Sequence, residues 1–175
     1  MKNYLLLFVL SFSMLMACGQ DSEADKATLR EEIKSLEKVL IENLDANKVA
    51  DTAKLVVSKS LEYAAKFPQD SLAAGYLFKA ADVSNGLKDY GKAIKYWGQV
   101  WRNYPAYKKA ADALFLQGFT YENALEDKDN AKVYYQDFLK RFPDHPLASQ
   151  VTLSLEMMDK NLDDLIKEFE TKYKD

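Results

Sequence analysis

The sequence is poor in the residues that build disulfides, zinc sites and phosphate-binding loops. Its 175 residues include one cysteine, one histidine and six glycines. A single cysteine excludes an internal disulfide, and no cluster of cysteine and histidine can hold zinc. No glycine-rich phosphate loop occurs, and the serines have no general base nearby. We therefore expect no catalytic residue, no metal site and no cofactor, and we predict that the protein is not an enzyme.

The charge of the chain is equally mild. Lysine and arginine number 24, aspartate and glutamate number 27, and the formal net charge is −3. The two signs are interleaved, so no basic tract indicates a nucleic-acid partner. Hydrophobic residues make up 48% of the chain, enough for the core of one or two compact units. Scarce glycine and only four prolines favour helices over strands.

Three polar features were weighed as possible sites. His145 lies in a PDHP turn and is interpreted as a solvated turn residue. The loop 126–130, EDKDN, lacks the glycine and the distant glutamate of a calcium loop, so it is interpreted as a turn between helices. Asp163 and Asp164 are adjacent and fit the first turn of a helix, where acids suit the helix dipole.

The N-terminus, MKNYLLLFVLSFSMLMAC, has the pattern of a secretion signal. Lys2 precedes an apolar run from Tyr4 to Ala17, which is 14 residues long. A helix needs about 20 residues to cross a bilayer, so this run is too short to span one. It fits the hydrophobic region of a signal peptide.

The end of that run, Leu15-Met16-Ala17-Cys18, resembles the lipobox of bacterial lipoproteins. The resemblance implies that Cys18 is lipidated and becomes the mature N-terminus. We then expect a signal peptide over 1–17, a flexible polar tether over 18–27 and a helical domain over 28–175. The alternatives are an ordinary signal peptide with a chance cysteine, or an N-terminal helix buried in the fold.

The rest of the chain reads as a succession of amphipathic segments separated by turn signals. No segment of comparable length alternates with the period of a strand. The predicted helices cover 28–44, 48–66, 71–86, 90–103, 108–125, 129–141, 147–159 and 162–173.

An aromatic-proline stop recurs along the chain. Pro68, Pro105 and Pro143 are 37 and 38 residues apart, a period typical of stacked helix pairs. With an offset of 38 the two central units align without a gap. That alignment pairs Tyr76 with Leu114, Ala80 with Gly118, Ala93 with Ala131, and Trp97 with Tyr135. Proline cannot continue a helix, so we interpret the stop as the boundary between repeats.

This pattern resembles the tetratricopeptide repeat (TPR), best over 71–105 and 109–143. The second helices match as alanine, an aromatic three residues on, and a proline eight residues later. The residues at repeat positions are Ala80, Ala93, Trp97, Pro105, Gly118, Tyr121, Ala131, Tyr135 and Pro143. The resemblance implies an all-α, TPR-like α-solenoid of about four antiparallel helix pairs, with degenerate pairs at both ends.

The first helices of TPR arrays line a concave groove that binds partners. Carried over to this sequence, the groove positions are Leu77, Ala81, Ser84, Asn85, Phe115, Phe119, Glu122 and Asn123, extended by Leu153 and Met157. An apolar groove of this kind suits a helix or an extended segment of a partner protein. The alternative is that Phe115 and Phe119 pack inside the array.

The sequence thus predicts a protein–protein interaction scaffold in the bacterial cell envelope. It is similar to the TPR lipoproteins of outer-membrane assembly, which implies a lipid anchor in the outer membrane, facing the periplasm, and an envelope protein as partner. The alternative is a structural lipoprotein that associates with itself. We expect no nucleic-acid partner.

Overall fold

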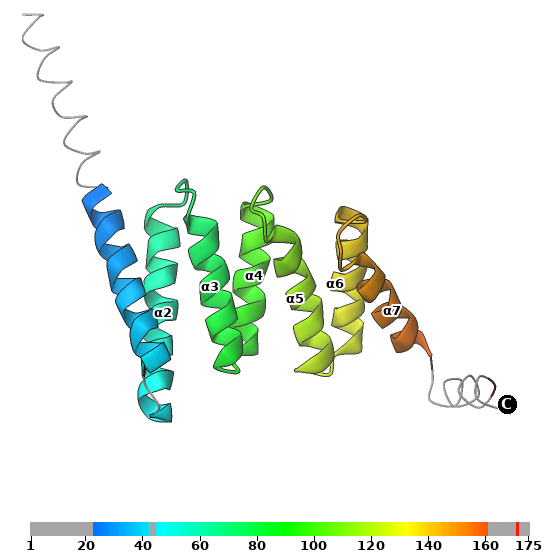
Figure 1. Ribbon diagram of the computed structural model, residues 1–175. Helices are drawn as coiled ribbons and strands as arrows, with labels where there is room; N and C mark the ends of the chain where they lie inside the picture. Colours follow the sequence, from blue (N-terminus) through cyan, green and yellow to red (C-terminus); the bar gives the residue numbers. More distant parts are fainter. Residues whose placement is uncertain (1–22, 43–44, 161–170, 172–175) are drawn as a thin grey trace, which may run out of the picture. The chain divides into compact units, whose positions relative to one another are not determined.

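The computed structural model describes residues 23–42, 45–160 and 171 (Figure 1). The predicted signal peptide, Cys18 and nearly all of the predicted helix over 162–173, including Asp163 and Asp164, lie outside these residues. Residues 23–160 form seven helices, and the described residues contain no strand. None of the helices in this part of the chain is long and apolar enough to cross a membrane.

The helices begin and end close to the predicted positions. They cover residues 23–42, then α2 (Ala46–Lys66), α3 (Ala73–Gly86), α4 (Tyr90–Asn103), α5 (Ala110–Asn123), α6 (Lys128–Arg141) and α7 (Ala148–Asp159). From α2 on, each described boundary falls within two residues of the prediction, and α4 matches it at both ends.

The first helix begins earlier than predicted. Residues 23–27, expected to belong to the tether, are helical. Glu23 and Asp25 stand in the first turn, where negative charge suits the helix dipole. The Nζ of Lys26 pairs with Glu23 at 2.6 Å and with Asp70 at 3.1 Å. The ion pair with Asp70 ties this turn to the loop between α2 and α3.

The chain divides into two compact units, Met1–Leu87 and Lys88–Asp175. In unit 1, the helix over 23–42 packs on α2 and α3 through a buried cluster of Leu29, Ile33 and Tyr63. The ring centroid of Tyr63 lies 5.2 Å from that of Phe67 and 4.4 Å from that of Tyr76. Aromatic side chains therefore join the second and third helices of this unit.

In unit 2, each helix from α4 to α7 packs on the next one along the chain. The core is formed by side chains of α5, α6 and α7. Its buried members are Ala111, Leu114, Phe115, Tyr135, Phe138 and Val151.

The three aromatic-proline stops share one backbone conformation. Phe67, Tyr104 and Phe142 end α2, α4 and α6 with φ near −130° and ψ between 54° and 59°. The N–H of each still donates to the helix carbonyl four residues back. Its carbonyl accepts from the residue three positions on, which begins the turn into the next helix. The predicted repeat boundary is confirmed.

The side chains at the repeat positions behave as the repeat pattern requires. Ala80, Ala93, Ala131 and Tyr135 are fully buried, and Trp97 is 1% exposed. Gly118 is buried, Tyr121 is half-buried, and the prolines at 105 and 143 are exposed. Small residues therefore lie where helices approach closely, and aromatic residues fill the interior.

Candidate protein-binding surface

The polar turns weighed as chemical sites have structural roles. Nδ1 of His145 accepts a hydrogen bond from the Leu147 N–H at 3.3 Å, and its ring packs edge-on against Phe138. The carboxylate of Asp127, in the loop 126–130, accepts from the Asn130 N–H at 3.0 Å and caps α6. This bond lowers the pKa of Asp127. Among the described residues, no three His, Cys, Asp or Glu side chains are placed to hold a metal ion.

The register of the first helices differs from the gap-free alignment. α3 begins at Ala73 and α5 at Ala110, which is an offset of 37, whereas α4 and α6 begin at an offset of 38. The loop after α5 contains one more residue than the loop after α3. Both loops then pass through a residue with positive φ, Lys88 or Glu126, before the capping aspartate. The offset of 38 is therefore wrong for the first helices.

The corrected register changes which residues of α3 and α5 correspond. Gly118 is equivalent to Ala81, and Phe119 is equivalent to Asp82. Burial follows this register, since Ala81 and Gly118 are both buried and Asp82 and Phe119 are both exposed. Sequence reasoning missed Asp82 as a surface position. The signal that could have found it is the longer turn, ALEDKD, before α6.

The predicted groove residues divide into buried and exposed members. Leu77, Ala81 and Ser84 of α3 are buried, and the hydroxyl of Ser84 donates to the Ala80 carbonyl at 2.7 Å. Asn85 is half-buried. The side chains of α3 that can reach solvent from this face therefore lie one residue further along the chain. Partner binding by these residues stays a prediction.

On α5, Phe115 is 9% exposed and Phe119 is 42% exposed. Their ring centroids are 5.8 Å apart, and Phe115 in turn stacks on Tyr135 at 5.9 Å. Asn123 is exposed, and its amide donates to the Phe119 carbonyl at 3.1 Å. Phe119 is thus an exposed aromatic ring that rests on a packed core.

The groove position at Glu122 is tied to the interior of unit 2. The hydroxyl of Tyr135 donates to Oε2 of Glu122 at 2.6 Å. Burial, together with this carboxylate, raises the pKa of Tyr135 strongly. The bond fixes the side of α5 that carries Phe119 relative to α6. A partner would therefore meet a rigid helix face at this point.

The predicted extension of the stripe on α7 is also exposed. Leu153 and Met157 are 57% and 45% exposed, while Val151 is fully buried in the unit 2 core. One face of α7 therefore packs on the core, and another face presents apolar side chains.

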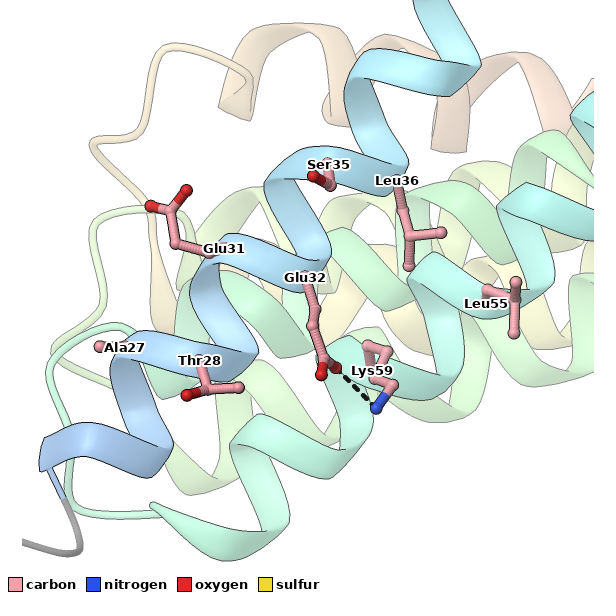
Figure 2. A pocket seen from close by; sticks show the side chains of 8 residues that line it. All are labelled: Ala27, Thr28, Glu31, Glu32, Ser35, Leu36, Leu55 and Lys59. Atoms are coloured by element: carbon pink, nitrogen blue, oxygen red, sulfur yellow. Dashed lines mark ion pairs between the residues drawn. The ribbon is translucent and has the colours of Figure 1, made fainter.

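Unit 1 has an open apolar groove that the sequence reasoning did not identify. It has a volume of about 860 Å³ and lies between the helix over 23–42 and α2. Figure 2 shows its lining residues, which are Ala27, Thr28, Glu31, Glu32, Ser35, Leu36, Leu55 and Lys59. Nζ of Lys59 pairs with Glu32 at 2.7 Å across the two helices. Leu55 is 51% exposed, and an exposed leucine beside small residues on the neighbouring helix was the available signal.

Comparison with known proteins agrees with the repeat seen in the coordinates. Residues 76–107 and 112–145 match the tetratricopeptide repeat family. The first match contains most of α3 and all of α4, and the second contains most of α5 and all of α6. Searches among curated proteins and among solved structures gave no match.

These matches, with the helix order and the packing of successive helices, confirm the predicted fold class, an all-α, TPR-like solenoid. TPR domains commonly bind protein partners and are generally not catalytic. The chain therefore contains two tetratricopeptide repeats, which suggest a protein–protein interaction scaffold.

Proposed function

We propose that this protein is a lipid-anchored scaffold of the bacterial cell envelope that binds a partner protein on the exposed face of α5. The observation that carries the proposal is Phe119, an exposed aromatic ring within a tetratricopeptide repeat. Aromatic side chains contribute a large share of the binding energy in protein interfaces because they bury much apolar area on one rigid group.

The surroundings of Phe119 support a binding role. The ring is held by Phe115, and the neighbouring Glu122 is fixed by Tyr135. A preformed surface loses little conformational entropy when a partner docks. The exposed polar side chain of Asn123, one turn further along α5, can give direction to a bound segment through hydrogen bonds. We therefore expect a partner segment with an apolar anchor residue flanked by polar groups.

The anchor in this proposal is Cys18. The lipobox-like end of the apolar N-terminal run supports lipidation there. With the TPR-like domain, it supports a place in the outer membrane facing the periplasm and a role in outer-membrane or envelope assembly. Self-association of the lipoprotein through the same face is the competing function.

Two matched variants test the proposal. Phe119→Ser removes the exposed ring of α5, and Val133→Ser removes an exposed apolar side chain of α6, which is 60% exposed. The full-length protein is purified from native membranes in mild detergent, and the co-purifying proteins are quantified by mass spectrometry. We expect an envelope protein that is lost from Phe119→Ser and retained by Val133→Ser.

Equal recovery with both variants would contradict a partner site at Phe119. Loss of homo-oligomers alone in Phe119→Ser, with no other protein affected, would instead favour self-association. Circular dichroism melting of both variants shows whether the fold is intact, so that loss of binding is not confused with unfolding.

A further inference from the structure

We infer that one end of unit 1 faces the lipid surface. We call it the anchor-side rim and define it as residues 23–26 and the turn 67–72. The inference rests on the proposed lipidation of Cys18. It adds an orientation of unit 1 on the membrane and a second interaction surface, whose partner is a layer of lipid headgroups.

The length of chain between the lipid and the first helix carries the inference. The helix already begins at residue 23, five positions after Cys18. Five residues span at most about 18 Å even when fully extended. A tether continuing to residue 27 would have allowed roughly 35 Å. The early start of the helix therefore confines residue 23 to the neighbourhood of the membrane.

Contacts within unit 1 bring the turn 67–72 to the same end. Nζ of Lys26 pairs with Asp70 at 3.1 Å and lies 5.6 Å from the ring centroid of Phe67. Figure 1 shows the turn between α2 and α3 beside the beginning of the blue helix. Whatever holds residue 23 near the membrane therefore holds this turn there as well.

The composition of the rim suits a headgroup layer. The charge of Lys26 is matched by Glu23 and Asp70, so the rim carries few unpaired charges. Leu72 is 41% exposed, and Pro68 is exposed beside it in the same turn. A small apolar surface of this kind can rest among headgroups without the basic face that an interfacial helix uses.

The long side of the first helix is a poorer fit to lipid. It exposes acidic and basic side chains at successive turns, with Lys34 paired to Glu31 at 3.9 Å and Lys38 to Glu42 at 3.7 Å. It therefore offers no continuous apolar stripe and no excess of positive charge. A helix needs both features to lie flat in the interface. Unit 1 accordingly stands on its rim.

An upright unit 1 places its opposite end away from the bilayer. The helix over 23–42 rises about 28 Å from its first to its last residue. The beginning of α2, which follows it, lies at that far end. Residues near 45–48 are therefore presented to the periplasm, and the rim is covered by lipid.

Energy transfer from the two ends of unit 1 to the membrane tests the inference. The full-length lipidated protein is reconstituted in vesicles of phosphatidylethanolamine and phosphatidylglycerol that contain a headgroup-linked acceptor dye. A donor dye is attached at Ser71→Cys in the rim or at Lys48→Cys at the far end, both exposed positions. Because lipidation consumes the Cys18 thiol, only the introduced cysteine reacts. We expect several-fold more efficient transfer from position 71 than from position 48.

Equal transfer from the two positions would overturn the rim, because unit 1 would then lie along the membrane. Greater transfer from position 48 would overturn it as well. Mass spectrometry of the N-terminal peptide reports lipidation separately. An unmodified Cys18 would overturn the anchor and the rim together, whereas a lipidated protein with equal transfer would overturn the rim alone.

Discussion

Nε1 of Trp101 donates a 2.6 Å hydrogen bond to Oε1 of Gln117, which joins α4 to α5. Nε2 of Gln117 donates a second bond of 2.6 Å to the Ile94 carbonyl on α4. Gln117 is 1% exposed, so both bonds are shielded from water on its side. Arg102 and Arg141 each lie 4.9 Å from the Trp101 ring centroid, which extends the contact to α6. Gln117 therefore links two helices at a position where the repeat pattern expects an aliphatic residue.

Replacement of Gln117 is expected to destabilise unit 2. Gln117→Ala removes two hydrogen bonds and leaves a cavity, so we expect a loss of about 2–4 kcal/mol in the free energy of unfolding. Gln117→Leu restores the volume without the bonds and should fall between alanine and wild type. Urea unfolding followed by circular dichroism measures all three.

The control for this prediction is Gln136→Ala on α6, because Gln136 is exposed. It should change the free energy of unfolding by less than about 0.5 kcal/mol. A loss of similar size in both alanine variants would contradict the structural role of Gln117.

Gly118→Ala is expected to destabilise the fold although alanine favours helices. An added Cβ at Gly118 would lie 2.7 Å from Cδ1 and 2.8 Å from Cε1 of Tyr135, which is fully buried and cannot move away easily. Overpacking of this kind costs about 1–3 kcal/mol. Gly86→Ala is the matched control in α3, since an added Cβ there has nothing within 4 Å.

For Gly86→Ala the helix propensity gain of up to about 1 kcal/mol should remain. Thermal unfolding should therefore move in opposite directions for the two variants. A stabilised Gly118→Ala variant would show that α5 and α6 can separate at little cost.

The helix ends could be predicted because strong local signals fix them. Phe142-Pro143 ends α6, and Asp127 begins it by capping a backbone N–H. Such signals depend on a few neighbouring residues and need no knowledge of the tertiary fold. The early start of the first helix was missed because its stabilising partner, Asp70, is far away in the sequence.

The face of the first helices could be predicted only within one residue. The proline spacing fixed the register of the second helices, and the extra residue in the loop after α5 broke that register for the first helices. A shift of one residue rotates a helix face by about 100°, which exchanges a buried Ala81 for an exposed Asp82. Whether Phe115 is core or surface required the positions of Tyr135 and Phe138, which lie on another helix.

The stability of unit 1 is expected to fall at acidic pH through Asp70. The N–H of Leu72, first, and the Lys26 side chain lower the pKa of this carboxyl in the fold. A folded pKa below the unfolded value of about 3.9 gives stabilisation above that pH, and the stabilisation disappears as pH falls through the folded pKa.

Asp70→Asn should therefore be less stable than wild type at pH 7 and lose less stability between about pH 4 and pH 2. Chemical unfolding at several pH values measures both slopes. Parallel pH profiles for the two proteins would contradict the stabilising role of the Asp70 carboxylate.

Cys18→Ser is expected to release the protein from the membrane. Serine cannot form the thioether that attaches the lipid, and no helix in the described part of the chain can span the bilayer. Cell fractionation should find wild type in the membrane pellet and the variant in the periplasmic fraction or unprocessed. Wild-type retention of a fully processed variant would contradict lipid anchoring.

The central claim is that a partner protein contacts the α5 face, and site-specific crosslinking in living cells tests it most directly. A photo-crosslinking residue replaces Phe119 in the lipidated protein, and the control carries it at Val133. The account predicts an adduct with an envelope protein from position 119 that position 133 does not give. Adducts with the protein itself alone, or the same adducts from both positions, would contradict it.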